Sequence, residues 1–257
     1  MTTLSTKKVN SPQLTFYDMG ADVVAFSTTR EGGCSIGNYA AFNINNYCGD
    51  SPAHIAENRR LLSELLGISS QHIIMPHQTH GTTVARVDGP PAATLEATDA
   101  LMTDCPGLCI GVSTADCIPI LLYDAQHRAV CAIHAGWRGT VKRIVRQAVR
   151  SMCDAYGSDA SLLRAVVGPG ISLEGFEVGD EVYLQFAEAG FDMGCIARRY
   201  EKWHIDLPLC NSLQLQEEGV KDIQLSGICT YRQYDRYFSA RRLGIQSGRI
   251  FTGIMLK

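Results

Sequence analysis

The sequence predicts a single domain in which helices and strands are interleaved, and three observations favour this fold class. Predicted strands and helices follow one another without a strict βαβ rhythm. Neither a linker rich in Ser and Pro nor an internal repeat divides the 257 residues. Apolar residues make up 46% of the chain, which is enough for a sizeable core. We expect one domain over residues 1–257, with residues 1–20 as a peripheral N-terminal segment.

Four helices are predicted from capping residues and apolar periodicity. The clearest spans residues 52–66, because Ser51 is a good N-cap, Pro52 suits the first turn and Gly67 suits the end. Its apolar stripe is formed by Ile55, Leu62, Leu65 and Leu66. The other helices are expected at about 141–153, at 179–189 and from about 206 to the residue before Gly219.

Strands are predicted from short apolar runs bounded by turn residues. They are expected at 21–27, 72–76, 82–87, 108–113, 117–123, 128–134, 163–168, 223–229, 236–241 and 249–256. No G-x-G-x-x-G follows a strand, and no G-x-x-x-x-G-K-[ST] is present, so a Rossmann or P-loop fold is disfavoured.

Charge and apolar patterning restrict the partners and the location. The chain has 23 Lys and Arg against 26 Asp and Glu, a formal charge of -3, which argues against a nucleic-acid binder. No basic cluster points to an anionic membrane. Residues 1–18 lack the apolar core of a signal peptide, and no apolar run has transmembrane length. We therefore expect a cytoplasmic protein whose ten cysteines are mostly reduced.

A predicted hairpin brings two reactive side chains together. Two apolar segments, 117–123 and 128–134, flank the polar loop 124–127. In a regular hairpin this loop would place Cys117 directly opposite His134, with about 5 Å between their Cβ atoms. That separation suits two ligands of one metal, and it equally suits a thiolate–imidazolium pair.

Other candidate residues carry weaker signals, each with an ordinary structural explanation beside the functional one. His80 is a third candidate, although a lone His near a strand is more often a hydrogen-bonded core or surface residue. Asp116 precedes Cys117 and could orient a ring or accept a proton, or simply cap the strand. Arg138 leads from a strand into a helix start, where glycines and the helix terminus favour an anion. Arg30 lies in a turn with two glycines, and Arg59 lies on the basic side of helix 52–66.

Ten segments together resemble the YfiH-like family, also called the laccase-domain or polyphenol oxidoreductase family. They occur in family order over nearly the whole chain after about residue 23, and T-A-D-C and H-A-G-W-R-G are the most specific. The segments are Thr29–Gly33, Gly49–Asp50, Glu57–Arg59, Gln78–Gly81, Asp99–Thr103, Thr114–Pro119, His134–Gly139, Gly168–Ile171, Cys229–Tyr231 and Phe238–Arg242.

The resemblance implies a single α+β domain with mixed β-sheets flanked by helices. It also implies a metal site whose ligands fall on His80, Cys117 and His134. Three activities are associated with the family. They are phosphorolysis of adenosine, inosine and methylthioadenosine together with adenosine deamination, copper-dependent oxidation of phenols, and removal of a wrongly added amino acid from cell-wall precursors. This chain has His77 where the family pattern often has Asn.

The residues allow these chemistries to be compared. Seven histidines without an H-x-H pair exclude a conventional laccase, although copper could still occupy a Cys/His2 site. The H-x-E and P-C-x-x-C motifs of cytidine-type deaminases are also missing. A His/Cys/His zinc site has three protein ligands and one open position, which is typical of a catalytic centre.

We therefore expect a zinc-dependent purine nucleoside enzyme, with Cu2+ as the alternative occupant. Its catalytic residues would be His80, Cys117, His134 and Asp116. Phosphate or ribose contacts are expected from Arg30, Arg59, Arg138 and Arg241, and a proton for the departing base from Asp116 or His77. The runner-up is a metal-free hydrolase that edits peptidoglycan precursors, with Cys117 as nucleophile and His134 as base. The partners would be a purine nucleoside and phosphate, with no nucleic acid or membrane, and the sequence does not indicate an oligomeric state.

Overall fold

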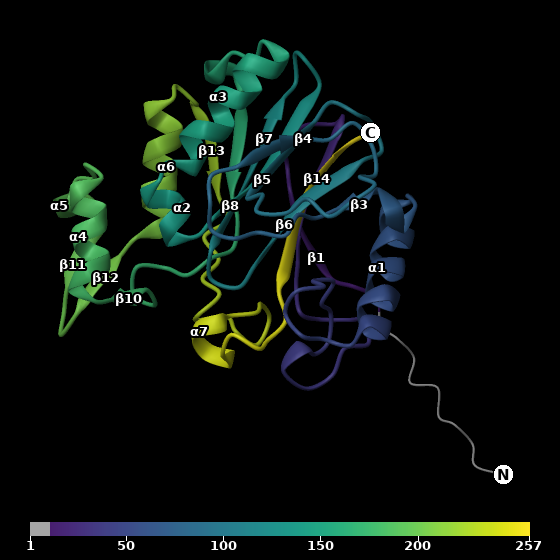
Figure 1. Ribbon diagram of the computed structural model, residues 1–257, viewed down its shortest axis with the longest axis horizontal. Coiled ribbons are helices and arrows are strands. Elements are labelled where there is room, and N and C mark those ends of the chain that lie inside the picture. Colours follow the sequence, from purple (N-terminus) through teal and green to yellow (C-terminus); the bar gives the residue numbers. More distant parts are fainter. Residues whose placement is uncertain (1–10) are drawn as a thin grey trace.

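Two stacked β-sheets form the centre of the molecule, which is a computed structural model that describes residues 11–257 (Figure 1). The five-stranded sheet has the order β1 (Leu14–Tyr17), β2 (Val23–Thr28), β14 (Ile250–Leu256), β6 (Cys109–Thr114) and β3 (Ile73–Ile74). The six-stranded sheet has the order β13 (Asp222–Leu225), β9 (Arg164–Val167), β7 (Ile118–Asp124), β8 (Ala129–Ala135), β5 (Ala100–Thr103) and β4 (Val84–Arg86). A small sheet contains β10 (Glu177–Val178), β12 (Trp203–Ile205) and β11 (Ala197–Arg199).

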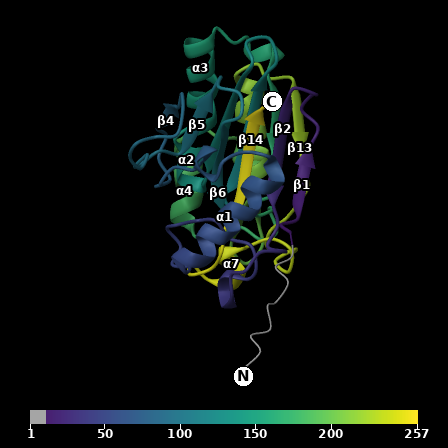
Figure 2. The same cartoon turned by 90° about the vertical axis from the view of Figure 1, so that its right-hand side faces the viewer.

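Helices cover both outer faces of this pair of sheets. The helix α1 (Pro52–Leu66) lies on one side, in front of β14 and β6 in Figure 2. The opposite side carries α2 (Trp137–Val141), α3 (Ile144–Tyr156) and α6 (Leu207–Glu217) (Figure 1). Beyond them, α4 (Asp180–Glu188) and α5 (Met193–Ile196) lie with the small sheet, and α7 (Ala240–Leu243) lies at the bottom of the view. The two large sheets contain both parallel and antiparallel pairs, so the predicted fold class is confirmed.

The alternation of side chains along β7 explains why the sheets stack. Leu121 points into the apolar cluster between the two sheets, together with Val112 and Ile254. Its neighbours Ile120 and Leu122 belong to the cluster under α3 and α6 on the other face. Every residue of β7 is buried, as expected for a strand that is covered on both faces. The strand ends are therefore fixed in position, and the site residues described below lie at those ends.

The helix predicted at 52–66 is confirmed as α1 with the same bounds. Pro52 occupies the first turn, and Gly67 ends the helix in the left-handed conformation with a φ of 68°. Ser51 has the extended backbone of an N-cap, but its side chain makes no capping hydrogen bond. The predicted apolar stripe is partly wrong, because Leu65 is 49% exposed whereas Leu62 is fully buried.

The predicted hairpin exists, but its register is wrong by two residues. His134 pairs with Pro119 and not with Cys117, which precedes the first residue of β7. The loop covers residues 125–128, since the Asp124 carboxylate accepts the backbone N–H groups of Gln126 and His127 at the end of the strand. A shift of two residues preserves the face of the sheet, because side chains alternate with a period of two.

Two other predicted elements differ from the structure, and five strands were not predicted. The strand expected at 236–241 does not form, because the Ser239 hydroxyl accepts the backbone N–H of Arg242 and begins α7. The helix expected at about 141–153 begins at Ile144, after Arg143 adopts a left-handed φ of 63°. The strands that were not predicted are β1, β5 and all three strands of the small sheet.

The domain boundaries stay a prediction. Residues 1–10 of the expected N-terminal segment lie outside the described residues, and β1 forms an edge of the five-stranded sheet. Among residues 11–257, no helix is both long and apolar enough to cross a membrane.

The contact between α1 and the five-stranded sheet leads to a stability prediction. Leu62→Ala removes a fully buried side chain from the cluster that contains Phe26 and Phe251. We expect the free energy of unfolding to fall by about 2–5 kcal/mol, since lost burial and a residual cavity add. Leu65→Ala on the same helix is the matched control, with an expected change within about 0.5 kcal/mol. Urea denaturation checks both variants, and equal losses would contradict the assigned face of α1.

Candidate metal centre

Three side chains that sequence analysis proposed as metal ligands meet at one point. The donor atoms of His80, Cys117 and His134 all lie within 4.8 Å of one another. The Cys117 Sγ lies 3.6 Å from the His80 Nε2, and the two imidazole rings meet edge to face with centroids 4.8 Å apart. His80 comes from the loop before β4, Cys117 from the residue before β7, and His134 from the end of β8.

The close approach of the three side chains depends on a glycine opposite Cys117. The β7–β8 pairing of Ile118 with Ala135 places Cys117 beside Gly136. A Cβ atom on Gly136 would lie 3.0 Å from the Cys117 Sγ and 3.2 Å from the His80 Nε2. Any side chain at this position would therefore occupy the space between the donor atoms.

Asp99 orients two of the three side chains, and sequence analysis did not assign it a role. Its buried carboxylate accepts the Nδ1–H of His134 at 2.8 Å, so the Nε2 of that ring is left for Cys117. The same carboxylate accepts the backbone N–H groups of His80 at 2.9 Å and Gly81 at 2.7 Å. Asp99 directly precedes the buried strand β5, and this position in the D-A-L-M-T segment is the signal that could have identified it.

Backbone conformation near the centre is unusual at two positions. His80 has a φ of 62° and Asp116 has a φ of 88°, both in the left-handed region that side chains other than glycine rarely adopt. Hydrogen bonds from the chain to Asp99 hold His80 there. Asp116 is held through its own carboxylate, which accepts the Thr230 hydroxyl and the backbone N–H of Arg241, both at 2.7 Å. Both carboxylate oxygens of Asp116 are thus engaged, and Asp116 does not line the cavity described below.

The charges of Cys117 and His134 stabilise one another. Burial raises the pKa of the Cys117 thiol, but the His134 and His80 rings outweigh burial and lower this pKa to about 6. Burial lowers the pKa of His134, but Cys117 and Asp99 outweigh it and raise this pKa to about 9. The arrangement therefore favours a thiolate at neutral pH, which is the form that binds metals and attacks electrophiles.

The donor set fits zinc. A tetrahedral zinc ion with Zn–S near 2.3 Å and Zn–N near 2.0–2.1 Å separates a sulfur and a nitrogen ligand by about 3.6 Å. The distance between Cys117 Sγ and His80 Nε2 is 3.6 Å. The Asp99–His134 hydrogen bond is the carboxylate–imidazole contact that usually orients a ligating histidine. Thiolate and imidazole also suit copper, so the donor set alone does not identify the metal.

The three donor side chains line one wall of an open cavity of about 220 Å³. The other lining residues come from the loop at residues 45–48, the segment 76–78 and the end of β6. Ala240 at the start of α7 and two residues that follow this helix, Ile245 and Arg249, complete the lining. The Gln78 side chain anchors its segment, because its amide donates to the Ser113 carbonyl and accepts the Ser113 N–H. The centre is therefore open to a small molecule on one side.

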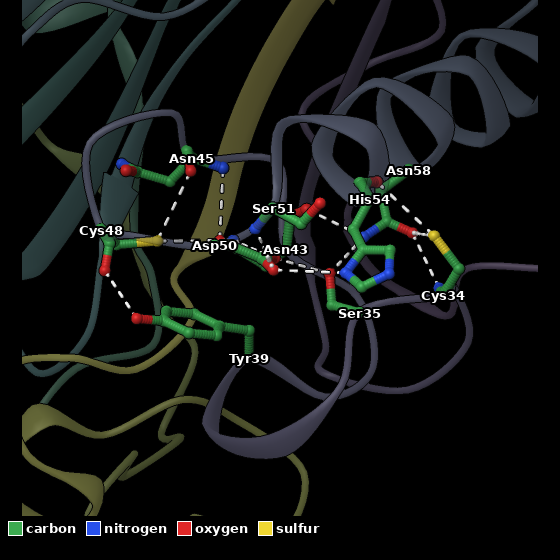
Figure 3. A network of polar contacts seen from close by, with 10 residues as sticks. All are labelled: Cys34, Ser35, Tyr39, Asn43, Asn45, Cys48, Asp50, Ser51, His54 and Asn58. Carbon is green, nitrogen blue, oxygen red and sulfur yellow. Dashed lines mark hydrogen bonds and ion pairs between the residues drawn. The ribbon is translucent and has the colours of Figure 1, made fainter.

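A buried polar network fixes the loop that carries Asn45, Tyr47 and Cys48 into this cavity (Figure 3). Its centre is Asp50, whose carboxylate accepts the Ser35 hydroxyl at 2.7 Å and the Asn43 side-chain amide at 2.9 Å. The Asn58 side chain of α1 joins the same network through Ser35 and the Asn43 carbonyl. Because Asn58 is fully buried, these bonds fix the loop to α1.

His77 lies in the cavity wall, as sequence analysis predicts for a substrate contact. Its Nδ1 lies 2.6 Å from the Glu96 carboxylate, and its ring stacks on Tyr47 with centroids 4.1 Å apart and planes 17° apart. Neither Glu96 nor Tyr47 was identified from the sequence. No local pattern could have revealed them, since both contacts form between separate loops.

The four predicted substrate-binding arginines do not line this cavity. Arg30 donates to the carbonyls of Ala40 and Tyr234, and Arg241 donates to the Glu177 carbonyl. The Arg138 guanidinium stacks 4.3 Å from the Trp137 ring centroid. Arg59 lines a neighbouring cavity of about 540 Å³, which shares the Tyr47 wall.

The arginine that does line the metal cavity is Arg249, which sequence analysis missed. Its guanidinium donates to the carbonyls of Ile245, Ser247 and Gly248. Its position between α7 and β14 depends on long-range packing, so spacing along the chain does not reveal it.

Comparison with known proteins agrees with this structure. A family model described as multi-copper polyphenol oxidoreductase laccase matches residues 24–257. A purine nucleoside phosphorylase of Bacteroides thetaiotaomicron is 45% identical over 249 residues, which cover 92% of each chain. The adenosine deaminase RL5 of an unknown prokaryotic organism is 42% identical over 248 residues, which cover 91% of this chain and 94% of that protein.

A solved structure shares the fold over almost its whole length. The crystal structure of the Bacillus licheniformis hypothetical protein YfiH has a TM-score of 0.91 at 28% identity, with 96% of this chain and 97% of that chain covered. The chain therefore belongs to the YfiH-like family, whose model describes a laccase-like polyphenol oxidoreductase.

Proposed function

We propose that this chain is a zinc-dependent purine nucleoside enzyme that phosphorolyses adenosine, inosine and methylthioadenosine and deaminates adenosine. The observation that supports this most is the three-donor centre of His80, Cys117 and His134 on the wall of an open cavity. A closed structural zinc site normally has four protein ligands, whereas a catalytic site keeps a position for water or substrate. The relatives named as a purine nucleoside phosphorylase and an adenosine deaminase support the choice of substrate.

Each residue of the centre has a distinct part in this proposal. His80, Cys117 and His134 hold the metal, which supplies Lewis acidity and activates a water molecule when it is bound. Asp99 fixes the ring of His134 and the backbone of His80, so the donors are oriented before the metal binds. The cavity walls would hold the nucleoside against the open side of the centre.

Arg249 replaces the four arginines expected from the sequence as the proposed phosphate contact. It is the one Arg or Lys among the cavity-lining residues in the described part of the chain. Its bonds to three carbonyls keep the guanidinium in place while its charge remains available to an anion.

A second function has one specific observation in its favour. The lowered pKa of Cys117, about 6, and the Asp99–His134–Cys117 order also describe a cysteine nucleophile with an oriented base. Such a centre would hydrolyse an amide without a metal, as in the editing of peptidoglycan precursors. His80 favours the zinc proposal, because a dyad does not need a third donor 3.6 Å from the sulfur.

The first test measures metal and activity in the same preparation. Purified wild-type protein should contain one zinc ion per chain and convert adenosine with phosphate to adenine, or adenosine alone to inosine. Cys117→Ser should lose both the zinc and the activity, whereas Cys195→Ser, a change at an exposed cysteine, should keep both. A folded, metal-free wild type without action on adenosine would overturn the proposal, and peptidoglycan precursors would then be assayed as substrates.

Asp99 provides a second test of the metal centre. Asp99→Asn keeps the size of the side chain but removes the charge that orients His134, so zinc affinity should fall about 10- to 100-fold. Competition with a zinc chelator measures the affinity directly. Asp104→Asn, which alters a carboxylate that pairs with Arg86 away from the cavity, should leave the affinity unchanged. Equal affinities in the two variants would contradict the role of Asp99.

The third test concerns phosphate. Arg249→Gln should raise the KM for phosphate at least about 10-fold, because a hydrogen bond to a charged group contributes about 1.5–3 kcal/mol. The KM for adenosine should stay within about threefold of the wild type. Arg138→Gln, outside the cavity, should change neither constant. A raised KM for phosphate in Arg138→Gln, with an unchanged KM in Arg249→Gln, would assign the phosphate contact to Arg138, as expected from the sequence.

A further inference from the structure

We propose that His77, oriented by Glu96, donates a proton to the purine base as the base is released. This inference rests on the proposed function and names a catalytic group that acts beside the metal centre. Among the histidines that line the cavity, His77 is the one outside the His80–Cys117–His134 cluster within the described residues.

The geometry of His77 leaves one ring nitrogen for a substrate. The Nδ1–H donates to the Glu96 carboxylate at 2.6 Å, and this bond fixes which nitrogen carries that proton. His77 lines the cavity and Glu96 does not. Because the Glu96 carboxylate engages the Nδ1, the Nε2 is the ring nitrogen that is left for a ligand in the cavity that His77 lines.

The backbone holds the two residues together. His77 and Glu96 form an isolated parallel bridge, with the His77 N–H donating to the Leu95 carbonyl at 3.0 Å. The Thr98 N–H in turn donates to the His77 carbonyl at 3.3 Å. His77 is therefore anchored at its main chain as well as at its ring, as a group that transfers a proton must be.

Tyr47 restricts the remaining freedom of the ring. It stacks on His77 at a centroid distance of 4.1 Å, and the network around Asp50 fixes its loop. Tyr47 is 44% exposed, so part of its ring remains open to the cavity that it lines. A purine held beside this stack would meet the imidazole in the plane of its ring, which is the approach that a hydrogen bond to the Nε2 requires.

The chemistry requires a proton at this place. In phosphorolysis the bond between C1′ and N9 breaks, its electron pair moves into the purine ring, and a phosphate oxygen forms a bond to C1′. Transfer of the Nε2 proton of protonated His77 to N7 neutralises that charge. The proton of hydrogen phosphate is released, and His77 regains one from solvent, which reaches both His77 and Glu96.

Several charged or titratable groups lie around His77. They are Glu96, Tyr47 and, along the cavity wall, His80, Cys117, His134 and Arg249. Because some of these belong to the metal centre, a pH profile alone would not isolate His77. A comparison of two substrates whose leaving groups differ in their need for a proton does isolate the role of His77.

The test compares two substrates of the zinc-loaded protein. His77→Gln places an amide near the former Nε2 position, so it keeps a hydrogen bond but cannot transfer a proton. We expect kcat for adenosine phosphorolysis to fall about 100-fold, since general acid catalysis contributes about 10²- to 10⁴-fold. With 4-nitrophenyl riboside, whose leaving group needs no proton, kcat should stay within about threefold of the wild type. Glu96→Gln should lower kcat for adenosine about 10-fold and leave the nitrophenyl substrate unaffected.

Two controls separate this role from a structural one. Zinc content and the calorimetric Kd for inosine without phosphate, a nucleoside that the protein cannot deaminate, should match the wild type in His77→Gln. His72→Gln, a change at an exposed histidine before β3, should have no effect on either substrate. Equal losses on both substrates, or no loss on adenosine, would overturn the role of His77. A zinc-loaded wild type that is inactive on both substrates would instead overturn the proposed function.

Discussion

The buried carboxylate of Asp99 is the interaction on which the metal centre depends. It joins β5, β8 and the loop of His80, which are far apart along the chain, through one ring N–H and two close backbone N–H groups. A fully buried carboxylate is costly unless its oxygens are satisfied, and here they are. The same bonds hold His80 in a left-handed conformation that its side chain would otherwise disfavour. The bonds to Asp99 therefore orient the His80 and His134 donors and fix the His80 loop at the same time.

The stacked sheets explain why such a site can be rigid. Both faces of β7 and β8 are buried, so neither strand can slide or twist without disturbing two apolar clusters. Cys117 and His134 lie at the ends of these strands, where the backbone leaves the sheet and side chains can reach the cavity. The loops that complete the cavity lack this support and are fixed by polar networks, around Asp50 on one side and through Gln78 on the other.

Local signals in the sequence predicted the parts of this structure that local physics decides. Pro52 and Gly67 at the two ends of α1 belong to this group, and so do the strands β7 and β8. The placement of Cys117 and His134 on one face of their hairpin belongs to it as well. The error of two residues in the register left both side chains on the predicted face, because side chains along a strand alternate with a period of two residues. The Glu96–His77 pair and the place of Arg249 depend on contacts between distant segments. The arginines were therefore the least predictable residues, since spacing does not show which guanidinium reaches a cavity.

The two chemistries considered for Cys117 use the same electrostatics. A thiolate stabilised by His134 is required both as a zinc ligand and as a nucleophile, so the lowered pKa does not distinguish them. The contacts of the two imidazoles beside the sulfur do distinguish the two chemistries. In a dyad the base must be free to accept and return a proton, and of the two imidazoles beside the Cys117 sulfur it is His134 that a carboxylate holds for that task. His80 is oriented just as firmly, through its backbone, with its Nε2 turned to the same sulfur. Gly136 keeps the space between the three donors clear of any side chain. The centre thus has two oriented imidazoles and one sulfur, with no side chain in the space between them. This arrangement favours metal binding over a single proton transfer.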